Sequence, residues 1–124
     1  MKIPKEYLPV MPYIIIENAT AFLEFTKTVF GATEQMIVPG EGDRSIMHGE
    51  IKIFDAVIMF ADKPEAFEIK PCGMFIYVEN VDHIYALAIE NKAVSLMPPM
   101  HQEYGYTAGF QDSFGNQWWI VEGE

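Results

Sequence analysis

Two histidine–glutamate pairs carry the residue types best suited to proton transfer or metal binding. His48 and Glu50 are separated by one residue, and the second pair, His101 and Glu103, has the same spacing. On a strand, His48 and Glu50 would face the same side, about 7 Å apart, because the backbone rises about 3.3 Å per residue. Imidazole and carboxylate groups at this separation could share a proton or anchor a polar ligand group.

Three interpretations of these pairs are open. One metal ion could draw on His48, Glu50, His101 and Glu103, since nitrogen and carboxylate oxygen are suitable ligands. Without a metal, His48 and Glu50 could form an acid–base pair that removes a proton next to a carbonyl group. In that case we expect burial to raise the pKa of Glu50, because an apolar environment disfavours the charged carboxylate. The third interpretation is a pair on the surface rim of the strand.

Trp118 and Trp119 are adjacent near the end of the chain. Successive side chains of a strand point to opposite faces of the sheet, so the two indoles cannot share one environment. We therefore expect one tryptophan to fill the core and Trp119 to face a cavity.

Composition limits the class of protein. A chain of 124 residues is long enough to form a single domain over residues 1–124 without disulfides. Cys72 is the only cysteine, which suits a reducing cytoplasm. No apolar run is long enough for a membrane helix, and no signal core is present at the N-terminus. The formal net charge of −10 repels phosphate backbones. We expect a cytoplasmic protein with neither nucleic acid nor membrane as a partner.

The first half of the chain predicts the element order β-α-β-β-β. Phe22, Phe25 and Val29 follow the spacing of an amphipathic helix. Asn18 is suited to cap the start of this helix, and Gly31 is suited to end it. The expected elements are strands over residues 9–17, 33–39, 45–54 and 56–62 and a helix over residues 18–31.

The second half predicts the same order again. Asn80 follows Asn18 after 62 residues, and Ile84 and Leu87 take the places of two helix phenylalanines. The expected elements are strands over residues 73–80, 93–97, 106–111 and 117–122, a helix over residues 81–93 and a proline-marked loop over residues 98–105 that carries the second histidine–glutamate pair. We predict an α+β protein of two tandem modules, at about residues 8–61 and 72–122, joined by a linker over residues 62–71.

A glutamate–asparagine pair before each helix and D-S-F-G-N before the last strand give the chain a family resemblance. The chain also carries H-G-E at residues 48–50, L-M-P-P at residues 96–99 and E-Y-G at residues 103–105. With these motifs in this order, the sequence resembles the vicinal oxygen chelate superfamily of glyoxalases, extradiol dioxygenases and bleomycin resistance proteins. Its demethylubiquinone-methyltransferase-like (glyoxalase-like) branch is the most similar. The resemblance implies a curved, U-shaped sheet around a cavity, with the helices outside, and a homodimer.

Enzymes of this superfamily take metal ligands from the first and last strands of each module. The corresponding residues here are Met11 and Gly73 on the first strands, Trp119 on the last strand, and Met59 or a neighbour in the first module. None of these side chains suits a hard or borderline divalent cation. We therefore expect no metal and no other cofactor.

The resemblance also assigns one face of the strands to the cavity. We expect this cavity to bind a small molecule through the side chains of Met11, Tyr13, Phe75, Tyr77, Tyr104, Tyr106 and Trp119. Relatives often carry arginine where Tyr106 stands, so an anionic ligand is not favoured. The alternative is that these residues simply fill the core.

Three functions follow from these observations. The first is a metal-independent binding protein with an aromatic-lined cavity for a small apolar or aromatic ligand. The second is a lyase or isomerase that uses His48 and Glu50 as an acid–base pair, with or without a relocated divalent metal. The third is a protein with a vestigial pocket that binds a partner.

Overall fold

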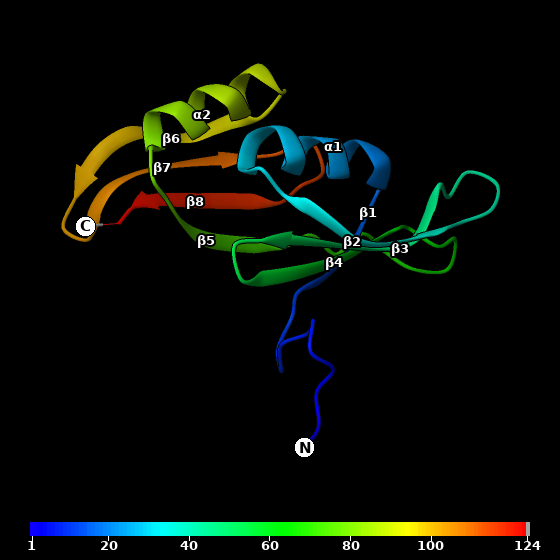
Figure 1. Cartoon of the computed structure of the whole chain (residues 1–124). Coiled ribbons are helices and arrows are strands. Elements are labelled where there is room, and N and C mark those ends of the chain that lie inside the picture. Colours follow the sequence, from blue (N-terminus) through cyan, green and yellow to red (C-terminus); the bar gives the residue numbers. More distant parts are fainter. Residues whose placement is uncertain (124) are drawn as a thin grey trace. The chain divides into compact units, whose positions relative to one another are not determined.

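Residues 1 to 123 are described by a computed structural model and form two compact units. The first unit covers Met1–Lys70, and the second begins at Pro71. Among these residues, each unit contains one helix and four strands in the order β-α-β-β-β (Figure 1). The expected α+β class with two βαβββ modules is confirmed. In the part of the chain that the structure describes, no helix is both long and apolar enough to span a membrane.

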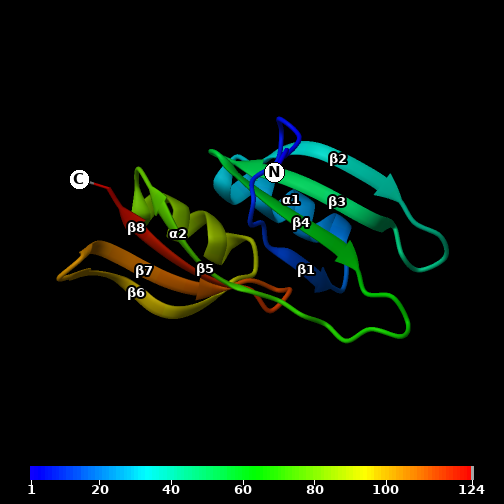
Figure 2. The ribbon, with the colours of Figure 1, turned by 90° about the horizontal axis from the view of Figure 1, so that it is seen from below.

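The first unit is a four-stranded mixed sheet with one helix against it (Figures 1 and 2). Its elements are β1 (Tyr13–Ile16), α1 (Ala19–Phe30), β2 (Thr33–Pro39), β3 (Ile46–Ile53) and β4 (Ala56–Asp62). The strand order is β1-β4-β3-β2, with β1 parallel to β4 and the other pairs antiparallel. The expected caps of α1 are confirmed: the side chain of Asn18 accepts from the backbone of Ala21, and Gly31 has a φ of 68°.

One face of this sheet is packed against α1. Phe22 of α1 and Phe60 of β4 are fully buried, with ring centroids 5.1 Å apart. Asp62 at the end of β4 is also buried, and its carboxylate accepts from the backbone nitrogens of Ala19 and Ile46. The start of α1, the start of β3 and the end of β4 are thereby tied to one side chain.

The second unit has the same architecture. Its elements are β5 (Gly73–Val78), α2 (Val81–Glu90), β6 (Val94–Gln102), β7 (Gly105–Gln111) and β8 (Gln117–Glu122). The strand order is β5-β8-β7-β6, and β5 runs parallel to β8. The side chain of Asn80 accepts from the backbone nitrogen of His83 and caps α2 as expected. The helix ends at Glu90, three residues earlier than the expected end at residue 93.

The predicted proline-marked loop over residues 98–105 is wrong. Strand β6 continues through Pro98 and Pro99 as far as Gln102, so His101 lies in the strand and only Glu103 lies in the turn that follows. Proline is tolerated here because β6 is an edge strand. The pairing with β7 shifts register between Met97 and Met100, which accommodates the two residues without a backbone donor.

The first strand also begins later than predicted. β1 starts at Tyr13 rather than residue 9, and Met11 precedes it. Pro12 has no N–H group to donate, although its carbonyl accepts from Met59. Met11 therefore does not occupy the strand position from which it was expected to face a cavity.

The D-S-F-G-N turn is held by the buried carboxylate of Asp112. This side chain accepts from the backbone nitrogens of Phe114 and Asn116, from the amide of Asn116 and from the indole nitrogen of Trp118. Asn116 in turn accepts from the backbone of Cys72, which joins the turn to the start of β5. Trp118 is 1 % exposed, so it is the tryptophan that fills the core.

Replacing Asp112 with alanine should lower the free energy of unfolding by about 2 to 4 kcal/mol, because several buried donors lose their acceptor at once. Chemical denaturation followed by tryptophan fluorescence measures this change. The matched control is Asp43→Ala in an exposed loop, which should cost less than about 0.5 kcal/mol. Equal costs for the two variants would contradict the structural role of Asp112.

Candidate functional site

The first sheet carries a row of side chains on the face opposite α1. Tyr13 pairs with Met59, Met59 pairs with Glu50, and Glu50 pairs with Met36, so the row crosses all four strands. Directly paired residues of neighbouring strands share a face. His48 lies two residues before Glu50 on β3 and therefore shares this face as predicted.

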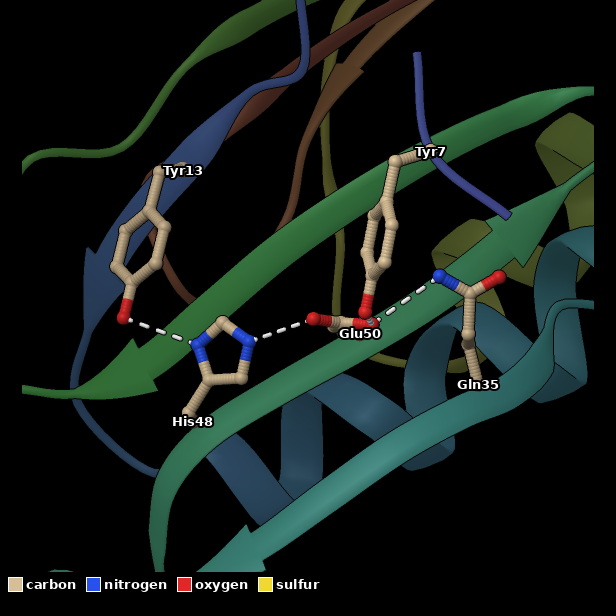
Figure 3. A network of polar contacts seen from close by, with 5 residues as sticks. All are labelled: Tyr7, Tyr13, Gln35, His48 and Glu50. Atoms are coloured by element: carbon tan, nitrogen blue, oxygen red, sulfur yellow. Dashed lines mark hydrogen bonds and ion pairs between the residues drawn. The ribbon is translucent and has the colours of Figure 1, made fainter. Parts of the chain in front are cut away.

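Glu50 is the centre of a hydrogen-bonded network within this unit (Figure 3). The residue is 2 % exposed. Its Oε1 atom accepts from the hydroxyl of Tyr7 at 2.8 Å and from Nε2 of Gln35 at 3.1 Å. Its Oε2 atom lies 2.7 Å from Nε2 of His48. The side chain thus has partners from the N-terminal segment, from β2 and from β3.

The expectation that burial raises the pKa of Glu50 is wrong. Desolvation acts in that direction and is the largest single influence. However, hydrogen bonds from His48, Gln35 and Tyr7, together with the charge of the imidazolium form of His48, outweigh it and lower the pKa below its ordinary value. Glu50 is therefore a carboxylate near neutral pH and cannot serve as a proton donor there.

His48 links the buried carboxylate to the solvent-exposed part of the row. Its side chain is 24 % exposed, whereas that of Glu50 is 3 % exposed. The Nδ1 atom lies 3.2 Å from the hydroxyl of Tyr13, and the two ring centroids are 5.6 Å apart. Tyr13 is itself 48 % exposed. The chain Glu50–His48–Tyr13 therefore runs from the interior of the sheet to its surface.

Sequence reasoning missed two members of this network, Tyr7 and Gln35. Gln35 is the extra residue at a register shift between Glu34 and Met36, and such a bulge can redirect a side chain. Tyr7 precedes β1, and its partner lies 43 residues further along the chain. The hydrogen bond to the carboxylate raises the pKa of Tyr7 above its ordinary value. No local pattern in the sequence indicated either contact.

The second sheet carries a different row at the corresponding register. Phe75 of β5 pairs with Trp119 of β8, and Trp119 pairs with Gly109 of β7. A methyl group at position 109 would collide with the six-membered ring of the Trp119 indole. The indole therefore lies over Gly109, and the absence of a side chain there leaves room for it.

Exposed aromatic residues lie on the same sheet as Trp119, and one of them, Phe75, is its strand partner. Phe75, Tyr77 and Tyr104 are each more than half exposed. The ring of Phe75 lies 5.7 Å from that of Tyr77 and 6.3 Å from that of Tyr104, measured between centroids. Trp119 is partly exposed. We define the aromatic cluster as four of the predicted binding residues: Phe75, Tyr77 and Tyr104, whose rings lie near one another, and Trp119, which pairs with Phe75.

Tyr106 does not belong to this aromatic cluster. It precedes Ala108 and Phe110 by two and four residues on β7, so it shares their face, which α2 covers. Its hydroxyl donates to Asp82 of α2 at 2.6 Å, and this contact raises the pKa of Tyr106. The placement differs from the expectation that Tyr104 and Tyr106 both line a binding wall.

The residues at the ligand positions expected from the fold are poor ligands for a divalent metal. In residues 1 to 123, no three histidine, cysteine, aspartate or glutamate side chains are placed together to hold an ion. The histidine–glutamate pair at positions 48 and 50 belongs to the first unit, and the pair at positions 101 and 103 belongs to the second. At the paired positions of β1 with β4 and β5 with β8, the residues are Tyr13, Met59, Phe75 and Trp119, which offer little to a hard cation.

These two βαβββ units define the fold of the vicinal oxygen chelate superfamily, to which the glyoxalases and bleomycin resistance proteins belong. No family model matches the chain, and no curated protein matches it significantly. Solved structures do match over nearly the whole chain. At sequence identities below 25 %, this similarity establishes the fold.

Three of these structures illustrate the likeness. Protein PA1353 from Pseudomonas aeruginosa has a TM-score of 0.78 and 20 % identity, over 94 % of this chain and 98 % of that one. The PhnB protein from Bacillus cereus has a TM-score of 0.75 and 15 % identity, over 94 % and 100 %. A glyoxalase/bleomycin resistance protein/dioxygenase family enzyme from Burkholderia phytofirmans has a TM-score of 0.69 and 22 % identity, over 89 % and 94 %.

The lowered pKa of Glu50 predicts a specific dependence of stability on pH. Its contribution to folding is present above about pH 4.5, the ordinary value, and is lost as the pH falls through the lower pKa of the folded state. The difference in unfolding free energy between wild type and Glu50→Gln should therefore shrink only as the pH falls below about 4.5. Denaturation at a series of pH values measures it. For the exposed Glu41→Gln control, the difference should stay near zero.

Proposed function

We propose that the protein binds a small, flat, apolar or aromatic molecule without a metal ion, and that the aromatic cluster of the second unit is the contact surface. The main support for this proposal is that the indole of Trp119 lies over Gly109. A glycine within a strand weakens a sheet, but here its lack of a side chain leaves the space that the indole occupies.

The exposure of the aromatic cluster supports a binding role over a packing role within this unit. Core aromatics of the same unit, such as Trp118 and Phe110, are buried to within 1 %. Phe75, Tyr77 and Tyr104 instead leave more than half of their surface free. Aromatic walls with few polar groups are typical of small-molecule sites. Burying their apolar surface against a ligand would be favourable at about 25 cal/mol per Å².

Ligand binding should change the fluorescence of Trp119. We expect saturable changes when flat aromatic compounds, with quinoline as the first probe, are titrated into the protein. Gly109→Ala should weaken the response at least tenfold, because the added methyl group displaces the indole. Trp119→Phe should remove it, since Trp118 is buried and held by Asp112.

Gly73→Ala is the matched control for Gly109→Ala. Gly73 is also a strand glycine, but an added methyl group would meet no atom within 4 Å. The fluorescence response of Gly73→Ala to quinoline should equal that of the wild type. A Gly109→Ala variant that is folded and responds like the wild type would show that Trp119 does not contact the probe.

Metal independence has its own test. Dialysis against a strong chelator should leave the Trp119 response to quinoline unchanged, and elemental analysis of the purified protein should find no stoichiometric divalent metal. We expect this because the donor set at the ligand positions of the fold is unsuitable. Stoichiometric zinc, nickel, manganese or iron whose removal abolishes the response would overturn it.

A further inference from the structure

The hydrogen bonds of the first unit determine which nitrogen of His48 carries a proton. Glu50 is ionised near neutral pH, so its Oε2 atom can only accept. The Nε2 atom of His48 lies 2.7 Å away and must therefore donate. In the neutral ring, the proton is then on Nε2 and the lone pair is on Nδ1.

The lone pair of Nδ1 points to the exposed side of the network. Its partner there is the hydroxyl of Tyr13 at 3.2 Å, which donates to it in the neutral ring. Tyr13 is 48 % exposed and His48 retains 24 % of its side-chain surface. A bound molecule could thus take the place of the tyrosine hydroxyl at Nδ1, while Nε2 stays anchored to the interior.

We propose that His48 is a general base that acts through Nδ1 on a carbonyl compound with an acidic C–H group, and that Glu50 is the residue that positions it. This goes beyond ligand binding by the aromatic cluster and does not depend on it. A buried carboxylate behind an imidazole holds the required tautomer and stabilises the imidazolium that forms when a proton is taken up. Tyr7 and Gln35 keep that carboxylate in place and charged.

The proposed step is a proton transfer within one substrate. The proton of the C–H bond next to the carbonyl passes to Nδ1, and the electron pair of that bond remains as an enolate. The hydroxyl of Tyr13, released from Nδ1, is available to donate to the enolate oxygen. Return of the proton from Nδ1 to another carbon of the conjugated system completes a double-bond shift. No oxidant, reductant or second substrate is consumed.

The structure also predicts what Glu50→Gln does to the imidazole. Tyr7 and Gln35 both donate to the Oε1 position, so they select the amide oxygen for that place. The amide NH₂ group then takes the Oε2 position and faces Nε2 of His48. Since this group donates, Nε2 must accept and the proton must move to Nδ1. The variant therefore places a proton on the atom that should act as the base.

Nuclear magnetic resonance of protein labelled with ¹⁵N-histidine tests this without any substrate. In its neutral form, the ring of His48 should carry its proton on Nε2 in the wild type and on Nδ1 in Glu50→Gln. The signal of His48 among the three histidines is assigned from His48→Gln. Tyr7→Phe is the matched control and should keep the wild-type tautomer. A wild-type ring protonated on Nδ1, or a tautomer unaffected by Glu50→Gln, overturns the assignment.

A simple carbon acid tests the chemistry. Conversion of 3-cyclohexen-1-one to its conjugated isomer can be followed by ultraviolet absorption, and general-base catalysis should contribute about 100-fold or more. His48→Gln and Glu50→Gln should both lose this acceleration, whereas Gly73→Ala should retain it. Acceleration that survives His48→Gln, or that does not exceed that of free imidazole at equal concentration, overturns the proposal. Neither result bears on the Trp119 fluorescence response, so the two functions can fail separately.

Discussion

A buried carboxylate has to be surrounded by donors, and in the first unit this requirement organises the candidate site. Glu50 sits on a sheet face where water cannot solvate it, and three side chains from separate segments supply the missing hydrogen bonds. One of these donors is the imidazole of His48. The buried hydrogen bond between Nε2 of His48 and Glu50 therefore determines whether Nδ1, the more exposed nitrogen, carries a proton.

The two units use one register position for opposite purposes. Glu50 pairs with Met59 in the first sheet, and Gly109 pairs with Trp119 in the second. At this register position the first unit carries the charged side chain of Glu50, which has its own hydrogen-bond donors. The second unit carries Gly109, which has no side chain and leaves room for the indole of Trp119. The repeated scaffold thus supports a polar site and an apolar surface on the same kind of strand.

Local patterns in the sequence were sufficient for most of the fold, because helix caps, helix spacing and the D-S-F-G-N turn act over a few residues. They were also sufficient to place His48 and Glu50 on one face. The pKa of Glu50 was predicted in the wrong direction because two of its donors, Tyr7 and Gln35, are reached only through tertiary contacts and a bulge. Likewise, Pro98 and Pro99 suggest a loop unless the strand that holds them is known to be an edge.

The contact between Gly109 and the indole of Trp119 also has an evolutionary consequence. Position 109 cannot gain a side chain while Trp119 stays in place, since that side chain would need the space that the indole fills. Among homologues of this chain, bulkier residues at 109 should accompany smaller ones at 119. Covariation between these two sites would thus distinguish descendants that kept the flat aromatic surface from those that abandoned it.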